Sequence, residues 1–214
     1  MVKKLQLTHL RRDYESEPLN AVELDNNPIA QFSVWFAEWL SCNPIEPTAF
    51  TLSTVTEQGL PDSRVVLLKD LWHDKFVFFT NYLSAKGRQI ANNPHVALNF
   101  YWPELNRQVR VKGVAAVLPE DLSKKYFAAR PFASQCSAYV SPQSQEITLE
   151  HLQHLLSAAE QRFASAPVPK PKHWGGYAVS ANEIEFWQGQ RGRLHDRIVY
   201  TCTAKTWHKI RLAP

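Results

Sequence analysis

The sequence predicts a mainly β protein, an antiparallel barrel with helices outside it. From residue 48 onwards the chain consists largely of short runs rich in β-branched and aromatic residues, and turn signals such as Glu57-Gln58-Gly59 separate them. The runs follow one another too closely for the long crossovers that a parallel sheet requires. Consecutive strands therefore pair in antiparallel fashion, and a barrel is the architecture that suits them.

Length and composition are those of one globular domain. The chain has 214 residues, of which 44% are hydrophobic and 21% are charged, so it is neither a disordered chain nor a membrane protein. Its three widely spaced cysteines favour reduced thiols, and its N-terminus lacks the apolar segment of a signal peptide. We therefore expect a cytoplasmic protein with an N-terminal arm over residues 1–27 and a single domain over residues 28–214.

The first regular element is a helix that begins at Pro28. Asn27 can cap free amides, and Pro28 is preset for the first helical position. Apolar residues then recur at the spacing of one buried helical face, namely Phe32, Trp35, Phe36, Trp39 and Leu40. We interpret this stripe as core packing rather than as a ligand site.

The β-rich part contains strands, short helices and one proline-rich connector. Strands are expected over 48–56, 63–69, 75–81, 95–101 and 107–117, with a short helix over 84–92. Longer helices follow over 119–129 and 148–164, and Glu120 and Asp121 favour the start of the first of these. After the connector over 166–172, strands are expected over 177–180, 183–188, 194–201 and 206–212.

The charge and the glycine content limit how an anion can be bound. The formal net charge of +4 suits a small anion as well as a nucleic acid. The seven glycines form neither G-x-G-x-x-G nor a P-loop. Any phosphate is therefore held by side chains and ordinary backbone amides. No metal-ligand spacing and no nucleophile motif stands out, which leaves difficult chemistry to an organic cofactor.

The densest functional signal lies between Arg193 and Arg197. On an extended strand, Arg193, His195 and Arg197 share one face, because side chains alternate. Two guanidiniums beside an imidazole suit a planar anionic ligand, and Trp187 lies upstream across a glycine-containing connection that a hairpin would close. The alternative is a solvated strand edge on which Asp196 is a surface counter-charge.

A second signal combines a phenol, a guanidinium and a hydroxyl. Tyr126 and Arg130 lie four residues apart on an expected helix, and Ser134 follows the break at Pro131. These groups make a plausible phosphate clamp. The alternative is a helix C-terminus at which Arg130 complements the helix dipole.

Two strands carry further cations. In the strand over 107–117, Gln108, Arg110 and Lys112 face one way, a pattern that taken alone is more often a half-exposed strand than a binding site. Arg64 and Lys69 lie five residues apart, on opposite faces of an ideal strand. They contact one ligand only if the strand bends.

These segments, in this order, resemble the pyridoxamine 5′-phosphate oxidase family. The resemblance runs from Leu10-Arg-Arg-Asp-Tyr14 to the C-terminal Arg211-Leu-Ala-Pro214 and covers nearly the whole chain. Between these ends lie residues 64–69, Phe79-Thr-Asn81, Arg107-Gln-Val109, Arg130-Pro131, Ser134-Gln135, Val140-Ser-Pro-Gln-Ser144, Trp174-Gly-Gly176, Glu185-Phe-Trp-Gln-Gly189 and Arg193-Leu-His-Asp-Arg197. The last three motifs, from Glu185 onwards, are specific.

The resemblance implies a fold, an activity and partners. The implied fold is an FMN-binding split β-barrel, antiparallel and Greek-key-like, in a homodimer with one FMN per subunit at the interface. The implied reaction oxidises pyridoxine 5′-phosphate or pyridoxamine 5′-phosphate to pyridoxal 5′-phosphate. Its acceptor is O2, which gives H2O2, and the amine substrate also releases ammonia. No metal, nucleic acid or membrane partner is implied.

The resemblance also implies residue roles. Arg193 and His195 would be catalytic, orienting the substrate ring and stabilising charge during hydride transfer. Ala85 departs from the arginine that many family members have there, and Phe79 replaces a frequent tyrosine. The implied FMN contacts are Arg64, Val65, Val66, Leu67, Leu68, Lys69, Phe79, Thr80, Lys86, Gln108, Gln143, Ser144, Trp187 and Arg197. The implied substrate contacts are Lys69, Tyr126, Arg130 and Ser134 at the phosphate, Arg193, Leu194 and His195 at the ring, and Arg11 and Tyr14 in a lid.

Three alternatives stay open at this point. The first is a related split-barrel flavoprotein such as a flavin reductase, against which Arg130, Ser134 and the pair Arg193 and His195 argue. The second is a non-catalytic protein that binds pyridoxal phosphate without a flavin. The third is a nucleic-acid-binding barrel, which requires clustered exposed cations with aromatic residues.

Overall fold

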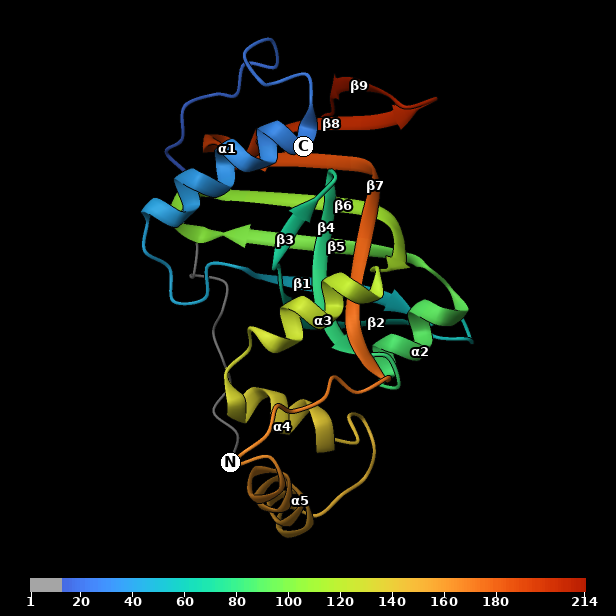
Figure 1. Cartoon of the computed structure of the whole chain (residues 1–214). Coiled ribbons are helices and arrows are strands. Elements are labelled where there is room, and N and C mark those ends of the chain that lie inside the picture. The colour runs from blue at the N-terminus through green and yellow to red at the C-terminus, as the bar shows by residue number, and fades with distance from the viewer. Residues whose placement is uncertain (1–12) are drawn as a thin grey trace, which may run out of the picture. The chain divides into compact units, whose positions relative to one another are not determined.

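The computed structural model describes residues 13–214, so Arg11 lies outside the described residues (Figure 1). Within this part, nine strands form one sheet and five α-helices flank it. The strands are β1 Ala49–Val55, β2 Pro61–Leu67, β3 Asp70–Trp72, β4 Lys75–Asn81, β5 His95–Trp102, β6 Arg107–Val117, β7 Trp174–Gln188, β8 Asp196–Thr203 and β9 Thr206–Arg211. The helices are α1 Pro28–Ser41, α2 Ala85–Asn92, α3 Glu120–Ala128, α4 Phe132–Val140 and α5 Leu149–Arg162.

The sheet confirms the predicted antiparallel architecture. Its strand order is β2-β1-β5-β6-β7-β4-β3, and β8 pairs with both β7 and β9. The pairs β1–β2, β1–β5, β3–β4, β4–β7, β7–β8 and β8–β9 are all antiparallel. Among residues 13–214, none of the helices has the length and apolarity that crossing a bilayer requires.

The chain forms two compact units. Unit 1 comprises residues 13–47, 100–110 and 183–214, and unit 2 comprises residues 48–99 and 111–182. Three strands, β5, β6 and β7, contribute residues to both units.

The core of unit 1 is built on the aromatic face of α1. The side chain of Asn27 caps the helix by accepting a hydrogen bond from the Ile29 amide at 2.9 Å, as predicted. Phe32, Trp35 and Trp39 are buried, and the rings of Phe32 and Trp39 lie against Trp102 of β5. The stripe is therefore core packing, although its last member, Leu40, is exposed. Each buried aromatic side chain contributes about 2–3 kcal/mol to stability.

The core of unit 2 has two parts. Alternate residues of β1 are buried, and Phe50 of this strand packs edge-on against Phe78 of β4. Helices α4 and α5 lie side by side (Figure 1) and enclose a second apolar cluster, to which Phe127, Cys136, Phe163 and Trp174 belong. This second cluster supports the Trp174 side of the site described below.

Three of the differences from the predicted elements have a clear physical reason. β2 ends at Leu67 because the chain then changes partner: Leu68 N–H donates to Thr48 of the segment before β1, and Lys69 N–H donates to Val77 of β4. The predicted strands over 177–180 and 183–188 form one strand, β7, which pairs with β4 in its first half and with β8 in its second. Helix α4 was not predicted, because Cys136 is its one buried residue and no apolar stripe marks it.

Candidate functional site

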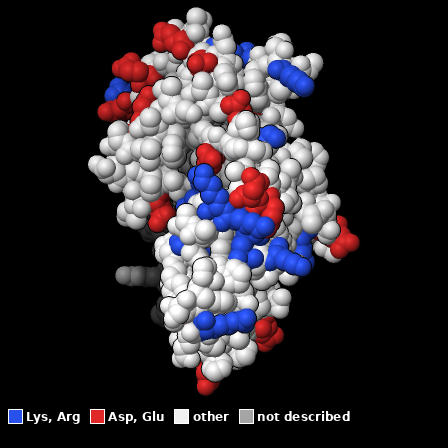
Figure 2. All heavy atoms as spheres, in the orientation of Figure 1, with Lys and Arg blue, Asp and Glu red and all other residues white. Residues whose placement is uncertain are grey.

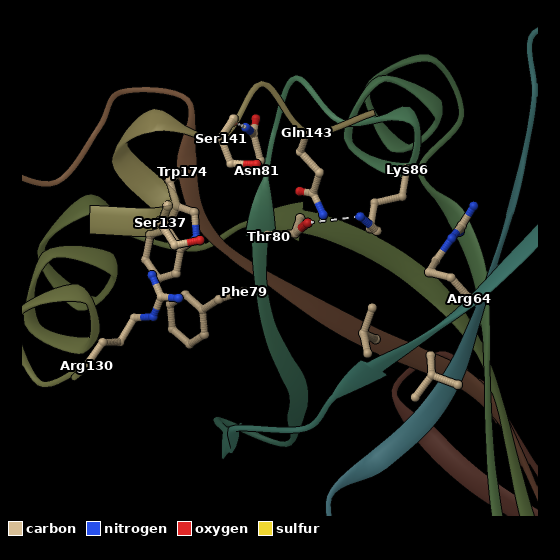
Figure 3. Close-up of a pocket in the computed structure, with 13 residues that line it drawn as sticks. Arg64, Phe79, Thr80, Asn81, Lys86, Arg130, Ser137, Ser141, Gln143 and Trp174 are labelled. Carbon is tan, nitrogen blue, oxygen red and sulfur yellow. Dashed lines mark hydrogen bonds between the residues drawn. The ribbon is translucent and has the colours of Figure 1, made fainter. Parts of the chain in front are cut away.

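Three cationic side chains, those of Arg64, Lys86 and Arg130, line a cavity of about 470 Å³ in unit 2. Figure 3 shows Arg130 beside Phe79 and Trp174 on one side, and Lys86 and Arg64 on the other. Figure 2 shows further Lys and Arg side chains around helix α3, which ends just before Arg130. Seven of the residues expected to contact a flavin line this cavity: Arg64, Val65, Val66, Phe79, Thr80, Lys86 and Gln143.

Lys86 is a buried ammonium group that has no counter-ion at contact distance among residues 13–214. It lies in the first turn of α2, whose start is fixed by Ser84, the Oγ of which accepts a hydrogen bond from the Gly87 amide. Lys86 is 8% exposed, and its Nζ donates to Thr80 Oγ1 at 3.3 Å and to Ser84 Oγ at 3.4 Å. Burial and the positive charge of Arg64 lower the pKa of Lys86. A desolvated cation held by two neutral hydroxyls favours an incoming anion.

Arg64 is already occupied by protein partners. Its Nη1 donates to Leu52 O and to Thr54 Oγ1, and its Nη2 contacts Asp62 at 2.5 Å and Gln89 Oε1 at 3.2 Å. Gln89 also donates to Asp62, and this hydrogen bond, together with Arg64, lowers the pKa of the Asp62 carboxyl. Within the described residues this leaves Nε–H as the guanidinium donor free for a ligand. The positive charge of Lys86 is therefore more available to a ligand than that of Arg64.

Arg130 offers a second anion-binding group. Its Nη1 is buried and has no hydrogen-bond partner in the described part of the chain, and burial lowers the pKa of this guanidinium. The guanidinium lies over the Trp174 ring, with Cζ 4.8 Å from the ring centroid. Buried donors in native proteins are normally paired. An anionic ligand in this cavity would supply the missing acceptor.

The four residues of the predicted phosphate clamp do not line one cavity. Arg130 lines the cavity just described, whereas Lys69 and Tyr126 line a second one of about 270 Å³. Phe79 lines both cavities, and its ring is stacked on Tyr126 with centroids 3.9 Å apart. Ser134 lies half-buried in α4 and lines neither of them. Arg64 and Lys69 accordingly line different cavities, because the chain bends between them.

In unit 1, three rings form a compact cluster. Trp187 and His195 have ring centroids 4.8 Å apart, and Tyr14 meets both edge-on, at 5.8 Å and 5.5 Å. The β7–β8 hairpin places Trp187 opposite Arg197, as predicted from the glycine-containing connection. That connection includes Gly189, where a Cβ would lie 2.6 Å from the Tyr14 ring.

The hydrogen bonds of His195 determine its tautomer. The backbone N–H of Gln190 donates to His195 Nδ1 at 3.0 Å, so Nδ1 carries no proton. Partial burial and the nearby Arg193 lower the pKa of the imidazole. At neutral pH the ring is therefore neutral with its proton on Nε2, and it is a hydrogen-bond donor at that atom.

Arg193, His195 and Arg197 do not share one face of a strand, so that part of the prediction is wrong. Residues 191–193 form a 3₁₀ turn in which Gly192 and Arg193 have φ values of +64° and +62°, and β8 begins only at Asp196. Consecutive left-handed residues cannot continue an extended strand. A non-glycine residue in this conformation is strained, which is common where a side chain has a functional position.

Asp196 is not the surface counter-charge that the alternative interpretation expected. It is 5% exposed, and its carboxylate accepts hydrogen bonds from Leu19 N at 2.9 Å and Gln190 Nε2 at 2.8 Å and pairs with Arg211. Gln190 Nε2 also donates to the backbone carbonyl of Glu17. Asp196 therefore attaches the N-terminal arm to the β7–β8 hairpin. Its role was missed because aspartate beside arginine is typical of a surface pair.

Arg197 is held by a residue that was not predicted as part of the site. Glu185 of β7 forms two hydrogen bonds with it, Nε to Oε1 and Nη2 to Oε2, both at 3.0 Å. The signal was present, since Glu185 lies two residues before Trp187 and strand alternation places both on one face.

The other predicted residues lie in varied surroundings. Leu68 is buried, Val66, Leu67 and Gln108 are half-buried, and Gln143 is exposed. Ser144 has a φ of +67° in the exposed segment after α4. Val65 and Leu194 are 66% and 75% exposed.

Fold and site together define a mainly β, split-barrel protein with a cavity that cationic side chains line. The family model described as pyridoxamine 5′-phosphate oxidase matches residues 37–163, and the model of the pyridoxine 5′-phosphate oxidase C-terminal dimerisation region matches residues 174–214. The chain therefore belongs to the pyridoxamine 5′-phosphate oxidase family.

Full-length relatives and solved structures agree with this assignment. Pyridoxine/pyridoxamine 5′-phosphate oxidase of Legionella pneumophila (strain Lens) is 49% identical over 100% of both chains, and that of Haemophilus influenzae (strain Rd) is 46% identical over 98% of this chain and 100% of its own. The crystal structure of PhzG from Burkholderia lata 383, in complex with tetrahydrophenazine-1-carboxylic acid, superposes with a TM-score of 0.87. It is 26% identical and covers 92% of this chain and 98% of its own.

Proposed function

We propose that this protein is an FMN-dependent oxidase that converts pyridoxine 5′-phosphate or pyridoxamine 5′-phosphate to pyridoxal 5′-phosphate. The observation that carries the proposal is a pair of cationic groups in unit 2. Among the described residues, the buried ammonium of Lys86 has two hydroxyl partners, and the buried Nη1 of Arg130 has no hydrogen-bond partner. Figure 3 places them on opposite sides of the cavity. Two separate anion-binding groups suit a reaction in which both cofactor and substrate are phosphate esters.

The residues present fit an FMN phosphate. Lys86 supplies a cation, Thr80 a hydroxyl and Arg64 its remaining Nε–H, and the side chain of Gln143 lies at the same cavity. Ala85 adds no charge, so Lys86 carries most of the electrostatic attraction. This arrangement agrees with the absence of a glycine-built phosphate loop.

Substrate contacts come from two sets of side chains. Arg130, with Lys69, Tyr126 and Ser134, would bind the substrate phosphate, and Arg193, Leu194 and His195 would contact the pyridine ring. Bound FMN would supply the two-electron oxidation at the substrate carbon C4′, with O2 as the final electron acceptor. His195, neutral and protonated at Nε2, orients the ring by donating a hydrogen bond, and Arg193 stabilises developing negative charge.

We further propose that the protein acts as a homodimer with FMN at the subunit interface. Trp187, Arg193, His195 and Arg197 all lie in the segment that matches the dimerisation region of the family. The exposed Val65 and Leu194 are apolar surface that such an interface would cover.

The activity is tested with purified protein in two measurements. A yellow preparation that releases FMN on denaturation, and that consumes O2 with pyridoxine 5′-phosphate but far more slowly with unphosphorylated pyridoxine, is expected. A colourless protein that binds pyridoxal phosphate would instead be a carrier. A yellow protein inactive on both phosphorylated substrates would be another split-barrel flavoprotein.

Tyr14 is expected to retain substrate as part of a lid formed by the N-terminal arm. Tyr14→Ala removes an aromatic group that packs on Trp187 and His195, contacts worth about 0.5–1.5 kcal/mol each. We expect KM for pyridoxine 5′-phosphate to rise roughly 10-fold, with kcat and FMN content nearly unchanged. Glu15→Ala is the control, because it breaks only an exposed ion pair with Arg191. Equal KM values for both variants would contradict the lid.

A further inference from the structure

We infer that Glu185 is a positioning residue that orients Arg197 toward the flavin. The inference rests on the proposed function, because it assigns Glu185 a part in FMN binding through a residue that is itself expected to contact FMN. All the side chains involved belong to unit 1.

The register of the β7–β8 hairpin brings the two residues together. Trp187 pairs with Arg197, and Glu185 pairs with Val199. Because side chains alternate along a strand, Glu185 and Trp187 share a face with Arg197, and Glu185 is its diagonal neighbour. Arg197 is therefore opposite Trp187 in the register and within reach of the Glu185 carboxylate.

The contacts define the plane of the guanidinium. Arg197 Nε and Nη2 donate to the two oxygens of Glu185 at 3.0 Å each, and Nη1 donates to the Ala213 carbonyl at 3.0 Å. A bidentate pair of this kind restricts rotation as well as distance. Three of the five N–H groups are thus engaged, which leaves, within residues 13–214, one on Nη1 and one on Nη2 for acceptors of a bound ligand.

Both oxygens of the Glu185 carboxylate accept hydrogen bonds, and the carboxylate is shielded from water. Glu185 is 5% exposed, and its Oε2 also accepts from Arg110 Nη1 of β6 at 3.3 Å. The hydrogen bond to Glu185 raises the pKa of Arg197, so its guanidinium stays charged. The buried carboxylate of Glu185 therefore restricts the orientation of the Arg197 guanidinium, whereas an arginine without such a partner can adopt many rotamers.

Glu185→Gln tests the positioning role, because it keeps the shape and removes the charge and one acceptor. We expect FMN to leave the holoenzyme about 10- to 100-fold faster on dilution into FMN-free buffer, as followed by the recovery of flavin fluorescence. Arg110→Gln is the matched control. It removes a neighbour of the same carboxylate and leaves the bidentate pair intact, so FMN release should change less than about 3-fold.

A double-mutant cycle shows whether Glu185 acts through Arg197. Arg197→Gln alone should accelerate FMN release, and adding Glu185→Gln should accelerate it no further. The double variant should also melt at a higher temperature than Arg197→Gln, in which a buried carboxylate has lost its main partner.

Two results would overturn the inference while leaving the proposed function intact. One is FMN release from Glu185→Gln at the wild-type rate. The other is full additivity of the two substitutions, which would mean that Glu185 acts independently of Arg197. Wild-type protein that binds no FMN would overturn the proposed function, and the inference with it.

Discussion

Replacing Lys86 with Met is expected to weaken FMN binding on the order of 30- to 100-fold without destabilising the apoprotein. A hydrogen bond to a charged group contributes about 1.5–3 kcal/mol, and the Lys86 ammonium is the principal cation available to the FMN phosphate. Arg64 cannot replace it, because Asp62, Gln89 and Thr54 occupy most of its donors.

The stability of the apoprotein, unlike its affinity for FMN, should not fall when Lys86 is replaced with Met. Lys86 is buried with two hydroxyl partners, so the folded protein without a ligand contains a desolvated cation. Met has a similar length and carries no charge. We expect the melting temperature of apo Lys86→Met to equal or exceed that of the wild-type apoprotein, while the increase in melting temperature on adding FMN shrinks.

Calorimetric titration of FMN into apoprotein and thermal melting measure these two effects separately. Arg88→Met is the control, because Arg88 lies two residues further along α2, is exposed, and does not line the cavity. FMN affinity that is unchanged in Lys86→Met, or equally weakened in Arg88→Met, would show that Lys86 is not the phosphate ligand.

Replacing Arg193 with Ala is expected to lower turnover on the order of 100-fold and to change FMN affinity less than about 3-fold. A preorganised charge near the reacting atoms typically contributes this much to a rate. Arg193 is exposed in a 3₁₀ turn and keeps a left-handed backbone, a position explained better by contact with a ligand than by packing.

The backbone of Arg193 provides an internal control. Arg193→Gly removes the same side chain but relieves the strain of a φ of +62°, so it should be about 0.5–1 kcal/mol more stable than Arg193→Ala. Both variants should be equally slow in steady-state kinetics. Arg191→Ala, which alters the same turn, should keep normal turnover. Loss of turnover that follows stability across the three variants would indicate a structural role instead.

The sequence predicted the regular elements better than the details of the site. β4 and β6 have the predicted bounds, because their β-rich runs are flanked by clear turn signals. The start of β8 was wrong, because Arg193 adopts a left-handed conformation that nothing but Gly192 beside it suggests. Helix α4 was missed for a different reason: it buries a single side chain, so hydrophobic periodicity could not reveal it.

Functional residues were predicted when they match a motif and missed when they act through another residue. Lys86 and Thr80, both predicted as flavin contacts, line one cavity, and Arg130, predicted at the substrate phosphate, lines the same cavity. Asp62 and Gln89, which engage Arg64, lie 27 residues apart in the sequence and meet only because α2 packs against the β1–β2 hairpin. We expect Lys86 to be the main phosphate ligand, because Ala85 adds no charge and most donors of Arg64 are engaged by protein partners.

The proposed oxidase activity is tested most directly by a single turnover without oxygen. Purified protein with its own flavin is mixed with pyridoxine 5′-phosphate in the absence of O2, and both the visible flavin absorbance and the pyridoxal 5′-phosphate formed are measured. We expect the flavin band to bleach with one pyridoxal 5′-phosphate formed per flavin, and the band to return when O2 is admitted. A flavin band that persists with saturating substrate, or bleaching without pyridoxal 5′-phosphate, would contradict the proposed function.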